Sequence, residues 1–172
     1  MYKRQIYGIS AFGLANNLGI SRGEASDYIK SYFEKFPGIK AYMEARKAEA
    51  KQHGYVKTIF GRKCHIKGIN DRNFSVRGFA ERQAINAPIQ GAASDVMRRA
   101  MIRMPAAIAP IEGARMLLQV HDELVFEVPK DSADQLIKTA KQVMEGAAMP
   151  AVNISVPLVV DAHAADNWND AH

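Results

Sequence analysis

Apolar positions recur at helical spacing along the first third of the chain. Residues 10–18 carry them at positions 11, 14, 15 and 18, and Gly19 is placed to end that helix. Ser21 opens a capping-box pattern, which predicts a second helix running to about Phe36. A third helix, rich in Ala, Glu, Lys and Met, is predicted over about 39–53. The first part of the chain is therefore expected to be helical.

The pattern changes to short β-prone runs after residue 54. Residues 55–59 and 64–66 flank a turn rich in basic residues, which predicts a basic hairpin. Helical spacing returns over 73–87, and Pro88 is expected to end or kink that helix because proline lacks a backbone N–H. A further helix is predicted over about 91–104.

The last third alternates between strands and a helix. Two apolar runs, 116–120 and 124–128, are separated by three polar residues and predict a tight hairpin. A helix is expected over about 132–147, followed by a final strand over 156–160. Trp168 is expected to dock the tail by burying its ring. The fold class is therefore predicted to be α+β, helical first and mixed afterwards.

Composition excludes several classes of protein. The chain of 172 residues is 48% hydrophobic and 24% charged, which is typical of a globular unit with a core. No apolar run approaches the roughly 20 residues of a membrane span, and none at the N-terminus resembles a secretory signal. Cys64 is the only cysteine, so an intramolecular disulfide and a Cys-rich zinc site are excluded. We expect a cytoplasmic protein that does not bind membranes.

Charge is distributed unevenly around a net value of +5. Residues 1–54 hold nine basic and five acidic side chains, residues 55–103 hold ten and three, and residues 104–172 hold four and ten. A basic segment this dense is consistent with a solvated face or with a track for a phosphate backbone. The acidic last third is equally distinct.

The most specific local feature is the polar tip of the predicted hairpin. Asp122 and Glu123 lie where a turn should form, flanked by strands that can hold a carboxylate in place for a magnesium ion. Hairpin tips are commonly polar, so a merely solvated turn is the alternative. His121 is a candidate base or hydrogen-bond donor, and zinc is discounted because no second His or Cys lies at ligand spacing.

A second feature suits a nucleic-acid duplex. Arg82 and Asn86 are four residues apart on a predicted helix, and Gln90 extends the same stripe if a kink at Pro88 is mild. These three residues, called the Arg82 stripe below, can donate hydrogen bonds to the acceptors of the minor groove. A solvated helix face is the alternative. In the basic turn, Arg62 and Lys63 could grip a phosphate.

Five strings occur in the order seen in A-family DNA polymerases of the bacterial DNA polymerase I type, and the chain resembles that family from Ile6 to His172. The strings are Tyr7-Gly8-Ile9-Ser10 with Ala11-Phe12-Gly13-Leu14, Gly54-Tyr55-Val56 with Gly61-Arg62-Lys63, Glu81-Arg82 through Ala87-Pro88 to Gln90-Gly91, Gln119-Val120-His121-Asp122-Glu123-Leu124-Val125, and Asn167-Trp168 with Ala171-His172. Five ordered matches make coincidence very improbable.

The resemblance implies roles for the candidate residues. Asp122 would be one of two aspartates that hold two Mg²⁺ ions for phosphoryl transfer, with Glu123 a less essential carboxylate nearby. His121 would contact the primer end, and the Arg82 stripe would touch the duplex. Tyr7 would lie beside the templating base. The implied partners are primer-template DNA and deoxynucleoside triphosphates, bound by a parent protein that acts as a monomer.

The chain also departs from the family pattern. The residues before Tyr7 do not match the Arg, Lys and aromatic residue of the family's fingers helix, and no candidate exists for the second catalytic aspartate. We therefore expect a C-terminal fragment that is inactive alone, with partial fingers over 1–76 and partial palm over 77–172, including a catalytic hairpin at 116–128. The alternative function is a non-catalytic nucleic-acid-binding module.

Overall fold

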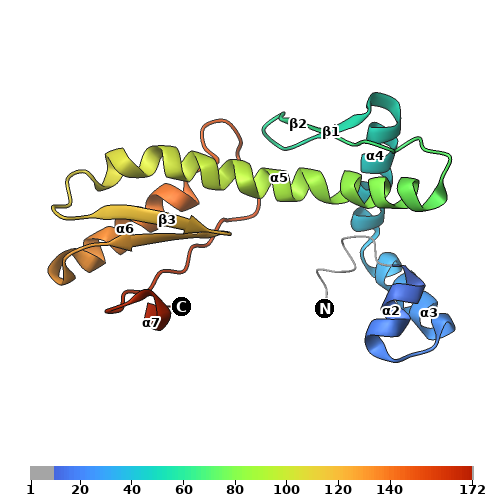
Figure 1. Ribbon diagram of the computed structural model, residues 1–172, viewed down its shortest axis with the longest axis horizontal. Coiled ribbons are helices and arrows are strands. Elements are labelled where there is room, and N and C mark those ends of the chain that lie inside the picture. The colour runs from blue at the N-terminus through green and yellow to red at the C-terminus, as the bar shows by residue number, and fades with distance from the viewer. Residues whose placement is uncertain (1–9, 172) are drawn as a thin grey trace. The chain divides into compact units, whose positions relative to one another are not determined.

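The computed structural model describes residues 10–171, in which helices accompany two small antiparallel sheets (Figure 1). This mixture confirms the α+β class. Packing divides the chain into two compact units, one ending at Gly91 and one beginning at Ala92. The predicted boundary after residue 76 concerns fingers and palm subdomains, which packing alone does not identify, so it stays a prediction.

The described part of the first unit, from residue 10 onward, begins with three helices whose ends follow local signals. They are α2 (Ala11–Leu18), α3 (Arg22–Lys35) and α4 (Pro37–His53). Gly19 ends α2 in the left-handed conformation, with φ of 67°. The predicted capping box is confirmed, because the Ser21 Oγ accepts from the Glu24 N–H at 3.2 Å and Glu24 accepts from the Ser21 N–H at 2.9 Å.

Strands β1 (Tyr55–Lys57) and β2 (Lys63–His65) form the predicted basic hairpin. Strand β1 is shorter than expected, and β2 begins one residue earlier than expected. One face of the hairpin turns to the core, where Val56 is fully buried and Cys64 is partly buried. The core residues around them are Ala50, Ile66, Ile69, Ala80 and Ala84. A hairpin of three-residue strands is marginal alone, so this burial is what stabilises it.

An ion pair joins α4 to α5 (Phe74–Ile108) in the first unit. The Lys51 Nζ lies 2.7 Å from the Glu81 Oε1, and this hydrogen bond lowers the pKa of the Glu81 carboxyl. A lowered pKa stabilises the fold above the carboxyl's ordinary pKa, and the contribution is lost as pH falls through the folded-state value. We expect Glu81→Gln to lower the free energy of unfolding by less than about 1 kcal/mol at neutral pH. The difference in melting temperature between the wild type and the variant should disappear at a pH low enough to protonate the Glu81 carboxyl in both the folded and the unfolded state.

Helix α5 is longer than the sequence predicts. It is one continuous helix of 35 residues, so the helices predicted over 73–87 and about 91–104 are joined, and Pro88 does not end the first of them. The helix also continues through Pro105, beyond the end predicted at about 104. A proline removes one backbone donor and crowds the preceding turn. Burial outweighs this loss, because Ala84 before Pro88 and Met104 after it are both fully buried.

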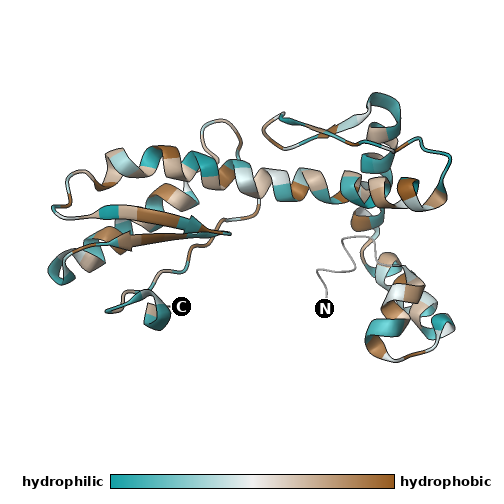
Figure 2. Cartoon of the chain, viewed as in Figure 1, coloured by the Kyte–Doolittle hydropathy of each residue, from teal (hydrophilic) through white to brown (hydrophobic). Residues whose placement is uncertain are grey.

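The second unit is built around the predicted second hairpin. Strands β3 (Arg115–Val120) and β4 (Glu123–Glu127) pair antiparallel, with a register irregularity between Met116 and Leu118. Both strands are strongly hydrophobic in Figure 2. Their apolar side chains pack on residues of α5 and of α6 (Ala133–Glu145), which follows a 3₁₀ turn, η1 (Lys130–Ser132). The buried residues of this core are Met104, Ile108, Ile111, Leu136 and Ala140.

Two expectations for the tail are wrong. No strand forms over 156–160 in the described chain, where Val156 and Val159 are 69% and 84% exposed. A β-prone run without an apolar face to cover gains too little from burial to form a strand. Trp168, at the start of α7 (Trp168–Ala171), is 47% exposed rather than buried.

Candidate functional site

The tip of the β3–β4 hairpin presents the candidate carboxylates. His121 and Asp122 form a two-residue loop between the paired residues Val120 and Glu123. His121 has φ of 53°, a conformation that non-glycine residues adopt uncommonly. The Gln119 Nε2 donates to the His121 carbonyl oxygen at 2.6 Å. The loop is therefore short and tied to its own strand, which limits how far Asp122 can move.

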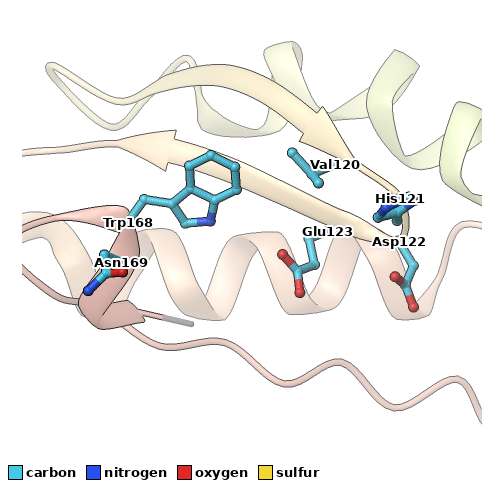
Figure 3. A pocket seen from close by; sticks show the side chains of 6 residues that line it. All are labelled: Val120, His121, Asp122, Glu123, Trp168 and Asn169. Atoms are coloured by element: carbon cyan, nitrogen blue, oxygen red, sulfur yellow. The ribbon is translucent and has the colours of Figure 1, made fainter.

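A hollow opens beside this tip (Figure 3). Its lining residues are Val120, His121, Asp122, Glu123, Trp168 and Asn169. Trp168 and Asn169 were not predicted as site residues. No local pattern could have revealed them, because they approach the hairpin from more than 40 positions further along the chain. The hollow thus combines two carboxylates and an imidazole with one aromatic wall.

The donor set at the tip suits Mg²⁺ in part. Asp122 and Glu123 are both exposed and offer the carboxylate oxygens that Mg²⁺ prefers. Within residues 10–171, no three His, Cys, Asp or Glu side chains gather into a complete metal site. Mg²⁺ usually takes only one or two protein carboxylates and completes its shell with water and substrate phosphates. The tip therefore fits a Mg²⁺ site in which water and substrate phosphates supply the remaining ligands. Asp122 as a metal ligand stays a prediction.

The Arg82 stripe lies on the part of α5 that belongs to the first unit. Because α5 is continuous through Pro88, the four-residue spacing extends to Gln90. Arg82 and Gln90 are exposed, and the Arg82 guanidinium lies 6.0 Å from the centre of the Phe79 ring. Asn86 is half-buried, and its Oδ1 has no hydrogen-bond partner among the described residues. The two exposed side chains are available for a duplex.

The basic hairpin docks on α5 immediately after this stripe. The Arg62 Nη2 donates to the Gly91 carbonyl oxygen at 3.0 Å. A Cβ added at Gly91 would lie 2.8 Å from the Thr58 Cγ2, so the Thr58 side chain can approach the backbone of α5 this closely only at a glycine. Lys63, next along the hairpin, holds its Nζ 4.7 Å from the centre of the Tyr55 ring. The structure thus brings Arg62 to the end of the Arg82 stripe, a contact that the sequence did not indicate.

Two arginines of the basic segment have structural roles. The Arg99 Nε donates to the Ala147 carbonyl at 2.9 Å, and the Arg103 Nη1 donates to the Gly146 carbonyl at 3.1 Å. Both guanidiniums also donate to the Met149 carbonyl. These carbonyls follow α6, where backbone acceptors have lost their helical partners. Part of the positive charge therefore fixes the second unit internally.

Tyr7, expected beside a templating base, lies outside the described residues. Among residues 10–171, no helix is long and apolar enough to cross a membrane.

Comparison with known proteins gives one consistent result. Residues 4–170 match the sequence profile of DNA polymerase family A. DNA polymerase I of Rhizobium leguminosarum is 58% identical over 170 residues, which are 97% of this chain and 17% of that protein. DNA polymerase I of Streptococcus pneumoniae is 52% identical over 167 residues, or 96% of this chain and 19% of that protein. The chain thus spans less than a fifth of the length of these relatives.

A solved structure is also similar. It is described as the POL domain of Pol1 from M. smegmatis in complex with DNA primer-template and dNTP. The TM-score is 0.84 at 39% identity, and the match covers 92% of this chain and 27% of the solved one.

Proposed function

The chain belongs to DNA polymerase family A, and from this membership we propose that the protein carrying it extends a DNA primer from deoxynucleoside triphosphates. The observation that carries the proposal is the two-residue tip that presents Asp122 beside Glu123. A short, tied loop is what a carboxylate needs to hold a cation in one place. The match of residues 4–170 to the family profile supports the same assignment. So does the order of the five strings between Ile6 and His172, which is the order in which the family has them.

The residues divide the work between binding and chemistry. Asp122, with Glu123 beside it, would hold Mg²⁺, and His121 would contact the primer end. Mg²⁺, when bound, lowers the pKa of the attacking hydroxyl and neutralises charge on the leaving pyrophosphate. In the first unit, the Arg82 stripe would donate to minor-groove acceptors, while Arg62 and Lys63 would add positive charge beside it. Tyr7 would help to select the incoming nucleotide.

We propose that the 172-residue chain alone does not catalyse extension, because only one of two metal-holding aspartates has a candidate in it. The test compares the chain with a chimera in which it replaces the matching segment of the R. leguminosarum polymerase. The chimera should extend a primer in a template-dependent manner, and the chain alone should not. Extension by the chain alone, lost on Asp122→Ala, would overturn this part of the proposal.

A non-catalytic DNA-binding module is the second candidate function. It is favoured by one observation, that the first unit contains the Arg82 stripe and the basic hairpin without the carboxylates of the second. An inactive chimera that still binds primer-template DNA would support this function over polymerisation. Such binding should weaken steeply as salt rises.

Arg82 provides a direct test of the DNA contact. We expect Arg82→Ala in the 172-residue chain to reduce the slope of log affinity against log salt by about 1, since one phosphate or groove contact is lost. Fluorescence anisotropy with a labelled duplex measures this slope. Arg22→Ala is the matched control, because Arg22 is an exposed arginine of the same unit on α3. Equal slopes for both variants would exclude Arg82 from the interface.

The remaining features of the parent protein follow from this function. A polymerase acts where DNA and deoxynucleoside triphosphates are found, so we propose a cytoplasmic location. One primer end needs one active site, which is consistent with a monomer.

A further inference from the structure

A tyrosine of α4 donates a hydrogen bond to the backbone of α5, where the two helices cross (Figure 1). The Tyr42 Oη lies 2.9 Å from the Ile85 carbonyl oxygen. Ile85 is 3% exposed and Tyr42 is half-buried, so the bond is partly shielded from water. A carbonyl inside a helix ordinarily accepts from the N–H four residues further on, so a side-chain donor at this position is additional to the helical pattern.

The turn that receives this donor is the one disturbed by Pro88. Pro88 has no backbone N–H, so the Ala84 carbonyl has no helical donor, and the proline ring crowds the carbonyls of the preceding turn. Ile85 belongs to that turn. Because Ala84, Ile85 and Pro88 are all buried, the turn has little access to water that could supply the missing bond. Tyr42 thus supplies a donor to the turn from which Pro88 removes one.

The surroundings of Tyr42 keep its hydroxyl protonated and its ring in place. Burial raises the pKa of Tyr42, and the opposing effect of the Arg46 charge is smaller. The Arg46 guanidinium lies 5.7 Å from the centre of the Tyr42 ring and forms an ion pair with Glu49 on the same helix. The hydroxyl is therefore available as a donor at neutral pH.

Asn86, the residue after Ile85, is the member of the Arg82 stripe that depends most on this turn. Arg82 and Gln90 are exposed and have longer side chains, whereas Asn86 is short and half-buried. Its Oδ1 is buried without a hydrogen-bond partner among residues 10–171, so its Nδ2 is the group suited to a minor-groove acceptor. The reach of a short side chain is set by its backbone. A small shift of this turn therefore changes whether the Asn86 amide meets the groove.

We propose that Tyr42 is a positioning residue for duplex binding, which holds the Ile85 carbonyl and thereby places Asn86 for its contact with the minor groove. The inference rests on the proposed function in taking a DNA duplex as the ligand of the Arg82 stripe. Tyr42 itself has no contact with DNA in this account and acts through Asn86. A neutral contact releases no counterions, so its loss weakens binding without changing the salt slope.

The experiment measures binding of the 172-residue chain to a labelled duplex by fluorescence anisotropy over a series of salt concentrations. Tyr42→Phe removes the hydroxyl and keeps the ring. It should weaken binding by about 3- to 10-fold, as expected for one lost hydrogen bond, and should keep the wild-type salt slope. Tyr28→Phe is the matched control, because Tyr28 is an exposed tyrosine on α3 in the same unit. The control should keep the wild-type affinity.

Two further backgrounds separate positioning from a general loss of stability. In Pro88→Ala, residue 88 has an N–H for the Ala84 carbonyl, so the turn no longer depends on Tyr42. In Asn86→Ala, the side chain that Tyr42 positions is absent. Tyr42→Phe should cause little further loss of affinity in either background, whereas a role confined to stability would give the same loss in every background. Urea unfolding checks that each variant is folded under the conditions of the binding assay.

Wild-type affinity of Tyr42→Phe overturns the inference, and so does an undiminished loss in either background. A lower salt slope for Tyr42→Phe would mean that charged contacts are displaced, which contradicts a role through Asn86. If Arg82→Ala still lowers the slope in these cases, the proposed duplex contact stands without Tyr42. If the wild-type chain binds no duplex, the duplex contact and the positioning role fail together.

Discussion

Replacing Asp122 by asparagine in the chimeric polymerase is expected to reduce primer extension by about 10³-fold or more. The substitution keeps the size of the side chain but removes the charge that holds a divalent cation at the hairpin tip. A metal ion contributes several kcal/mol of charge stabilisation in phosphoryl transfer, and each 1.4 kcal/mol is about tenfold in rate. Single-turnover extension at saturating nucleotide measures the loss.

Affinity for primer-template should change little in the same variant, because the Arg82 stripe and the basic hairpin of β1 and β2 belong to the first unit, whereas Asp122 belongs to the second. Asp131→Asn is the matched control, since Asp131 is an exposed aspartate of η1 in the same unit as Asp122. Glu123→Gln should cause a smaller loss than Asp122→Asn. Full activity of Asp122→Asn would show that the metal assignment at the tip is wrong.

Local signals predicted most of the fold. The Ser21 capping box, the left-handed glycines after α2 and α4, and both hairpins all depend on residues within a few positions of each other. The tip carrying Asp122 belongs to this group, because a polar pair between two apolar runs specifies a turn by itself. The strongest candidate site was therefore visible in the sequence.

Features set by distant contacts were not predictable. Local sequence left open whether the helix ends at Pro88, and α5 continues through it with buried residues on both sides. The run 156–160 has strand propensity but remains exposed, because propensity acts only where a partner surface exists. Trp168 reaches the Asp122 hollow, and Arg62 reaches Gly91, across separations that no periodicity reports.

The close approach at Gly91 leads to the second large effect, a loss of stability in Gly91→Ala. An alanine Cβ would lie 2.8 Å from the Thr58 Cγ2 and 3.1 Å from the Arg62 Nη2. The guanidinium is the end of a flexible side chain and can shift, but Thr58 is only 5% exposed and its Oγ1 accepts from the Phe60 and Arg62 N–H groups. Overpacking of this kind lowers the free energy of unfolding by about 1–3 kcal/mol.

Intrinsic helix propensity predicts the opposite sign, since alanine in a helix is favoured over glycine by roughly 0.5–1 kcal/mol. Gly78→Ala isolates that term, because Gly78 lies inside α5 and the atom nearest to its added Cβ is the Arg82 Nη1 at 3.7 Å, an ordinary contact, so it should raise the melting temperature. Thr58→Ser removes the clashing methyl and keeps the hydroxyl acceptor. The double variant Thr58→Ser with Gly91→Ala should therefore be less destabilised than the sum of the single variants. Additive effects in urea unfolding would mean that the hairpin does not rest on α5 at Gly91.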